Sequence, residues 1–121
     1  MVVRLRSAVI ESIENTETKR LKIVKISSKE EGASVSIELP EALCDTLRPQ
    51  DSVVVVMDSK PLAKGEKSKL YLESKVFRTS GDNDLDVIGT VGGLRLTIAL
   101  SKPTAAQRTT FDTEKIYFMI Q

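Results

Sequence analysis

The sequence contains no histidine and no tryptophan, and its only cysteine is Cys44. Histidine is the commonest general base and metal ligand, so its absence excludes Ser-His-Asp and Cys-His catalytic arrangements and Cys/His zinc sites. A single cysteine cannot form an intrachain disulfide, which indicates a reducing, intracellular setting. The chain also lacks a P-loop and a dinucleotide-binding glycine motif. We therefore expect no catalytic residues, no metal, no cofactor and no small-molecule substrate.

A strong excess of either charge is also lacking. The 18 Lys and Arg residues nearly balance the 17 Asp and Glu residues, which gives a formal net charge of +1. Proteins that bind nucleic acid mainly through its phosphates usually carry a clear excess of basic residues, so bulk nucleic-acid binding is not expected to be the main activity. Residues 1–6 have no apolar segment of signal-peptide length, and no apolar run reaches transmembrane length. We expect a cytoplasmic protein with no membrane partner.

What the chain does contain is a period-two alternation of apolar and polar residues, the spacing typical of β-strands. The alternation is clearest over residues 35–39, 94–100 and 116–120. Further strand-like segments lie at 3–13 (with a bend), 21–26, 53–57, 69–78 and 86–91. The run 53–57 is apolar throughout and short, which is typical of a strand buried on both faces.

Only one helix is predicted, over Pro40–Leu47, because proline is favoured in a first turn and Arg48-Pro49 would end the helix.

With only 4% aromatic residues, the core must consist mainly of Val, Ile and Leu, which are good strand formers. A length of 121 residues fits one domain, residues 1–121. Seven or eight short strands in one domain predict an all-β barrel, since closure removes exposed strand edges. Glycines such as Gly89 would allow the bends or bulges that a small barrel needs.

Two features resemble reactive sites but have a simpler interpretation. Asp82, Asp84 and Asp86 are spaced like acidic metal ligands, yet position 87 is Val where the calcium-loop pattern has Gly. We interpret them as solvated carboxylates of a hairpin turn. Cys44 lies in an apolar segment with no electropositive neighbour in the sequence, which favours a small buried hydrophobe over a reactive thiol.

A basic stretch runs from Lys60 to Lys75, where five lysines against two glutamates give a local charge of +3. Lys64, Lys67 and Lys69 are therefore candidates for contact with nucleic acid or with an acidic subunit surface. The alternative, which we favour, is a solvated loop beside a lysine-protected strand edge.

Gly92-Gly93-Leu94 is the most unusual local feature. One interpretation is a tight connection between strands, with Leu94 starting the next inward face. The other is a place where the backbone of a partner approaches closely because side chains are absent. The two interpretations are compatible, and the sequence favours neither.

The second half of the chain resembles a known family in the order of its motifs. The relevant segments are Tyr71–Arg78, Gly81-Asp82, Gly89–Leu96 and Phe111–Ile120. In this order they resemble the eighth subunit shared by the eukaryotic nuclear RNA polymerases and the archaeal counterpart of that subunit. In that family a Gly-Lys-Val-Tyr-Arg-like strand precedes a Gly-Gly-Leu motif and a closing strand of the Val-Tyr-Leu-Leu-Met type.

The matching elements here are Ser-Lys-Val-Phe-Arg at 74–78 and Ile-Tyr-Phe-Met-Ile at 116–120. Eukaryotic members carry a long acidic insertion after the fourth strand, whereas residues 58–68 are short and basic here, which fits the archaeal form.

The resemblance implies an eight-stranded antiparallel barrel related to the OB fold. It also implies a non-catalytic role in transcription, as part of archaeal DNA-dependent RNA polymerase, docked on the largest subunit near its pore and funnel. The expected subunit interface is Val91, Gly92, Gly93, Leu94 and Leu96. Nucleic acid would be at most a secondary partner. The alternative hypothesis is a free-standing OB-fold protein that binds single-stranded nucleic acid.

Overall fold

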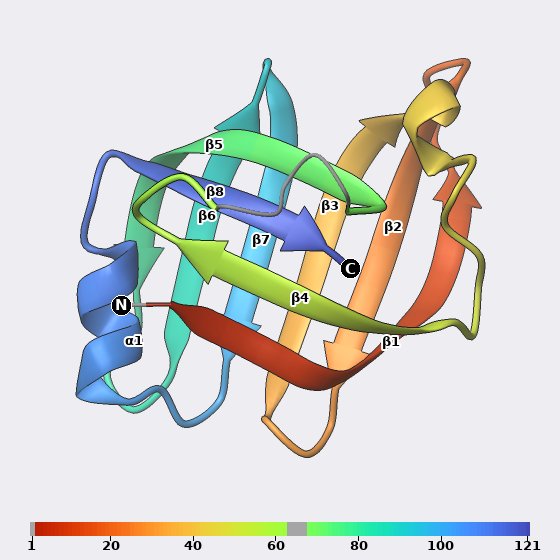
Figure 1. Cartoon of the computed structure of the whole chain (residues 1–121). Coiled ribbons are helices and arrows are strands. Elements are labelled where there is room, and N and C mark those ends of the chain that lie inside the picture. Colours follow the sequence, from red (N-terminus) through yellow and green to blue (C-terminus); the bar gives the residue numbers. More distant parts are fainter. Residues whose placement is uncertain (1, 63–67) are drawn as a thin grey trace.

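Eight antiparallel strands close into a β-barrel in the computed structural model, which describes residues 2–62 and 68–121 (Figure 1). The strands are β1 (Val3–Asn15), β2 (Leu21–Ser28), β3 (Ala33–Pro40), β4 (Ser52–Asp58), β5 (Leu70–Ser80), β6 (Leu85–Val91), β7 (Leu94–Leu100) and β8 (Lys115–Ile120). Each segment predicted from the alternation is a strand here. The prediction of an all-β, OB-like barrel is confirmed.

The strand order around the barrel is β1-β2-β3-β7-β6-β5-β8-β4, and β4 pairs again with β1. Two consecutive meanders, β1-β2-β3 and β5-β6-β7, are joined where β3 pairs with β7. β8 closes the other side because it inserts between β5 and β4. β1 carries two register shifts, between Leu5 and Ala8 and between Ile10 and Ser12. These shifts form the bend expected in the first strand and let β1 pair with β4 along its first half and with β2 along its second.

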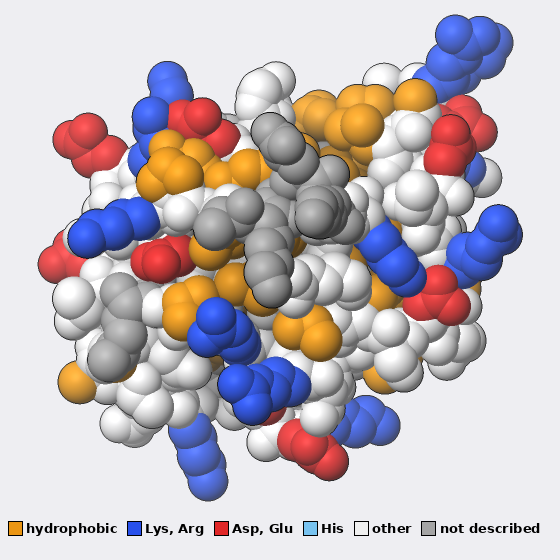
Figure 2. All heavy atoms as spheres, in the orientation of Figure 1, with side chains coloured by type: hydrophobic (Ala, Val, Ile, Leu, Met, Phe, Trp, Pro, Cys, Tyr) orange, Lys and Arg blue, Asp and Glu red, His pale blue; other side chains and the backbone are white. Residues whose placement is uncertain are grey.

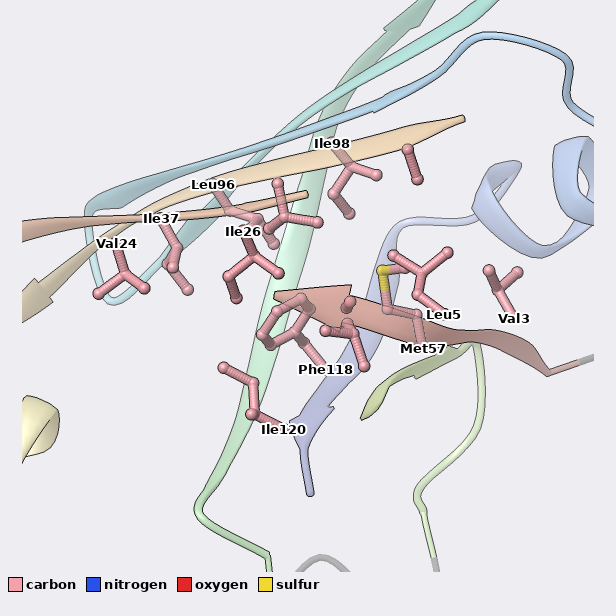
Figure 3. Close-up of a cluster of buried hydrophobic side chains, with 14 of the residues drawn as sticks. Val3, Leu5, Val24, Ile26, Ile37, Met57, Leu96, Ile98, Phe118 and Ile120 are labelled. Atoms are coloured by element: carbon pink, nitrogen blue, oxygen red, sulfur yellow. The ribbon is translucent and has the colours of Figure 1, made fainter. Parts of the chain in front are cut away.

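The barrel interior is packed with the inward-facing residues of all eight strands. The largest fully buried side chains are Phe111, Phe118, Leu5, Ile10, Ile26, Ile37, Leu39, Met57, Leu96, Ile98, Ile116 and Ile120. Figure 3 shows several of them pointing toward one another from opposite walls of the barrel. The core is therefore mainly aliphatic, as the low aromatic content requires. Val56 is also buried (3% exposed) but lies outside this cluster, opposite Met119 on the outer face.

The helical segments differ from the sequence-based expectation. Only Glu41–Cys44, within the predicted Pro40–Leu47, is helical, and it forms a short 3₁₀ helix, η1. The α-helix of the fold is α1, Ala105–Phe111, which the alternation pattern did not predict. Its sequence signal is a capping box. Thr104 Oγ1 accepts a hydrogen bond from the Gln107 backbone N–H (3.1 Å), and Gln107 Oε1 accepts one from the Thr104 N–H (2.9 Å).

The α1 helix is attached to the barrel at two points. Its last residue, Phe111, is fully buried in the core. Its Arg108 guanidinium donates hydrogen bonds to the backbone carbonyls of Asp82 and Asp84, at 2.8 and 3.0 Å, in the turn between β5 and β6. Burial of one ring thus compensates for the weak intrinsic stability of a seven-residue helix.

Candidate interaction surface

The hairpin between β6 and β7 ends in the Gly92-Gly93 pair. Val91 and Leu94 form the last pair of the two strands, so the glycines are a two-residue turn. Their φ angles are +56° and +86°. A type I′ turn needs positive φ at both central residues and fits the twist of the flanking strands, which explains why both are glycine. The interpretation of a tight connection is confirmed, and Leu94 lies on the inward face of β7.

The tip of this hairpin is also open. Gly92 and Gly93 are exposed, and a Cβ built on either would meet no atom within 4 Å. Val91 and Leu94 beside them are half-buried, and Val91 packs against the core. The tip thus presents bare backbone between two apolar side chains, a geometry that leaves room for another chain.

Leu96 was expected to be part of the interface, and that expectation is wrong. The side chain is 1% exposed, belongs to the core cluster, and its residue pairs with Ile37 and Gly89. Because alternate residues of β7 point into the barrel, a partner on the intact surface cannot touch Leu96. Next to the tip of the hairpin, Arg95 is exposed instead, and its N–H donates to the Glu38 carboxylate at 2.8 Å. This bond continues the β3–β7 contact one position beyond the last paired residues.

A second exposed feature lies on β5, where Phe77 is 79% exposed. Val76 pairs with Gly89 and Arg78 pairs with Ile88, so Phe77 is the extra residue of a β-bulge. Phe77 follows the inward-facing Val76, so the alternation of β5 places it on the outer face, and the bulge turns Arg78 outward beside it. The strand pattern did not distinguish Phe77 from core aromatics. The available signal was the alternation of Leu70, Leu72, Ser74 and Val76, which places Phe77 on the opposite face.

Two more aromatic residues lie on the outer face of the same part of the barrel. The rings of Tyr71 on β5 and Tyr117 on β8 have centroids 6.2 Å apart. The other two of the five aromatic residues, Phe111 and Phe118, are in the core. We name the outward set of Tyr71, Phe77 and Tyr117 the aromatic face. Figure 2 views the molecule from the side of β4, β5 and β8 and shows hydrophobic side chains lying between Lys and Arg side chains there.

Cationic side chains border the aromatic face. Lys75 and Lys115 are neighbours across β5 and β8, and both are exposed, as is Arg78. Lys115 Nζ lies 2.6 Å from the Glu73 carboxylate, an ion pair that raises the pKa of Lys115. A hollow of about 610 Å³ lies beside these groups, lined among others by Lys75, Phe77, Thr90 and Lys115.

Of the three lysines singled out in the sequence, the structure describes Lys69, which lies just before β5. Lys69 is exposed, and its Nζ lies 4.0 Å from the Asp51 carboxylate. Its backbone N–H donates to the Ile120 carbonyl at 2.8 Å, so its backbone is fixed against β8. Lys64 and Lys67 lie outside the described residues.

The aspartates and the cysteine singled out in the sequence lie in a turn and against the core, respectively. Asp82 and Asp84 lie in the β5–β6 turn, where their carbonyls bind Arg108. Within residues 2–62 and 68–121, no three His, Cys, Asp or Glu side chains come together as a metal site would require.

Cys44 is half-buried against the core, its Sγ lies 3.7 Å from the Pro40 carbonyl, and burial raises the pKa of its thiol. Cys44 is thus only partly buried, and its interpretation as a small buried hydrophobe in place of a reactive thiol stays a prediction.

Comparison with known proteins found that the chain matches no family model and no curated protein sequence. Neither helix in the described part of the chain has the length and apolar character needed to cross a membrane.

Proposed function

We propose that the protein is a non-catalytic subunit of an archaeal DNA-dependent RNA polymerase, working in the cytoplasm, where it docks on the largest subunit and supports assembly for transcription. The support is the resemblance in motif order together with one structural observation. The Gly-Gly-Leu motif lies at a hairpin tip where neither glycine has a neighbour within 4 Å of a would-be Cβ.

The proposed contact consists of Val91, Gly92, Gly93 and Leu94. Bare backbone at a tip lets another chain approach more closely than any side chain would allow. The two half-buried apolar side chains beside the tip would gain burial on docking, since partial burial leaves apolar area to remove from water. Chemistry belongs to other subunits in this proposal, which agrees with a sequence that has no histidine.

The test is purification of the tagged protein from its native extract, followed by mass spectrometry. Recovery of the large polymerase subunits in equal amounts is the expected result. Recovery of nucleic acid without polymerase would overturn the proposal in favour of the free-standing single-stranded nucleic-acid-binding module.

A matched pair of variants separates docking from folding. Gly92→Asn places a side chain at the open tip, yet asparagine suits the first central position of a type I′ turn. We expect the unfolding midpoint to stay unchanged and recovery of the largest subunit to fall by about tenfold, equivalent to about 1.4 kcal/mol. Lys29→Asn in the β2–β3 turn is the control and should alter neither. Gly93 is a poorer target because its φ of +86° would strain any larger residue. If Gly92→Asn recovers as much of the largest subunit as the unaltered protein does, the Gly-Gly-Leu motif acts only as a turn.

A further inference from the structure

We propose that the surface around Phe77 is an interface between two copies of this chain. A two-fold axis would place the Phe77 ring of each copy in the hollow that lies beside Phe77 on the other copy. This inference goes beyond the proposed subunit role and does not rest on it, because it concerns the outer surface of β5 and not the Val91–Leu94 tip.

Phe77 supplies the projecting part of the contact. Its side chain is 79% exposed, and it lies in the β5 bulge opposite Gly89 and Ile88. Ile88 is half-buried and also faces outward, because Val87 and Gly89 on either side of it are buried on the inward side of β6. The patch thus has two neighbouring apolar side chains that a docked partner would remove from water.

The hollow of about 610 Å³ supplies the receiving part. Phe77 itself lines it, together with Ser59, Lys75, Val76, Thr90 and residues 113–115. The Val76 N–H donates to the Glu114 carbonyl at 2.9 Å, which fixes the backbone beside Phe77. An isologous contact uses the same surface on both copies, so the projecting ring and the hollow must lie on one patch, as they do here.

The charges of the patch complement one another across such an axis. Lys75 and Glu114 line the same hollow, and neither forms an ion pair with another residue of the described chain. Lys115, by contrast, is already paired with Glu73 at 2.6 Å. A second copy can therefore offer its Glu114 to Lys75 and its Lys75 to Glu114, so that each dimer contains this ion pair twice.

The balance of charge favours a second copy over a strongly charged partner. A polyanion on this patch would meet the carboxylates of Glu73 and Glu114, which a copy of the chain meets with lysines. The net charge of +1 gives little repulsion between copies, and a net charge near zero favours association. Because the apolar centre is small, we expect a weak and reversible dimer of the transient class.

Sedimentation equilibrium of the intact protein tests the contact, over about 1 µM to about 1 mM. The average mass should rise with concentration from the 13.3 kDa of one chain toward twice that value. Phe77→Ala should raise the dimer Kd at least about tenfold, because it removes the aromatic anchor. Leu43→Ala is the control and should leave the Kd unchanged, since Leu43 on η1 is the other exposed large hydrophobic residue of the described chain (44%).

Two charge reversals test the two-fold arrangement. Lys75→Glu and Glu114→Lys should each weaken self-association, because like charges then face each other across the axis. A mixture of the two variants should form the dimer again, since every contact then joins a glutamate to a lysine. Lys29→Glu, the same charge change in the β2–β3 turn, should associate like the unaltered protein.

Three results would overturn the proposal. The first is a mass that stays at that of one chain up to the highest concentration. The second is a dimer that Phe77→Ala and Leu43→Ala weaken equally, which would place the contact elsewhere. The third is a mixture of Lys75→Glu and Glu114→Lys that associates no better than either variant alone, because the two-fold pairing of these residues requires the mixture to associate.

Discussion

Gly89 on β6 and Lys75 on β5 lie so close that a Cβ added to Gly89 would be 2.6 Å from the Lys75 carbonyl oxygen. The same Cβ would be 2.7 Å from the Oγ of Ser74. Ser74 is fully buried, and its single hydroxyl proton is shared between the backbone carbonyls of Thr90 and Lys75, at 3.2 and 3.3 Å. Gly89 therefore leaves the space that a buried hydroxyl needs beside the bulge that carries Phe77.

This close approach predicts the effect of Gly89→Ala. The added methyl group meets backbone that cannot move without disturbing the β5–β6 pairing, so we expect a loss of about 1–3 kcal/mol in the free energy of unfolding. Urea denaturation measures it. Thr90→Ala, an outward change on the same strand, should cost no more than about 0.5 kcal/mol. Equal stability of Gly89→Ala and the unaltered protein would contradict the steric explanation.

Phe118 and Phe77 allow the same substitution to be compared in two environments. Phe118 is fully buried in the barrel, whereas Phe77 is 79% exposed. Phe118→Ala should lower the free energy of unfolding by about 3–5 kcal/mol, because it leaves a cavity in a closed core. Phe77→Ala should change it by no more than about 0.5 kcal/mol. Similar losses in urea denaturation would mean that Phe77 packs against the barrel in solution.

The capping box of α1 predicts a smaller effect at Thr104. Thr104→Ala removes the oxygen that accepts the Gln107 N–H, and such changes cost about 0.5–2 kcal/mol. Because α1 supplies Phe111 to the core, the loss should appear in the cooperative thermal unfolding of the whole barrel. Thr104→Ser keeps an accepting hydroxyl and is the control. A separate early transition would show instead that α1 unfolds independently of the barrel.

The thiol of Cys44 predicts a pH dependence with a definite sign. Burial raises its pKa in the folded protein above the ordinary value of 9.0, so the folded state disfavours the thiolate. The unfolded chain therefore loses the thiol proton first, and this contribution to stability is present below pH 9 and is lost as pH rises above it. At pH 8 the folded protein should react with iodoacetamide more slowly than the urea-unfolded chain, since only the thiolate attacks. Equal rates in the two states would contradict burial of Cys44.

The strands followed from the sequence because period-two alternation is a local property. The runs at 35–39, 94–100 and 116–120 each bury alternate side chains as the pattern requires. The α1 helix was missed because its segment has seven residues and no apolar period, so only the Thr104 and Gln107 pair marked it. The expectation for Leu96 failed because proximity to Gly92-Gly93 in the chain is not proximity on the surface.

The sequence by itself determined the composition of the core, the inward side of most strands and the Gly92-Gly93 turn, since each depends on neighbours in the chain. Only the tertiary structure decided that β3 pairs with β7 and that β8 lies between β5 and β4. It also decided that Arg78 joins Phe77 on the outer face, because the bulge that turns Arg78 outward forms in response to the strand opposite it. Pairing between distant segments depends on how the whole barrel closes, and no local pattern encodes that closure.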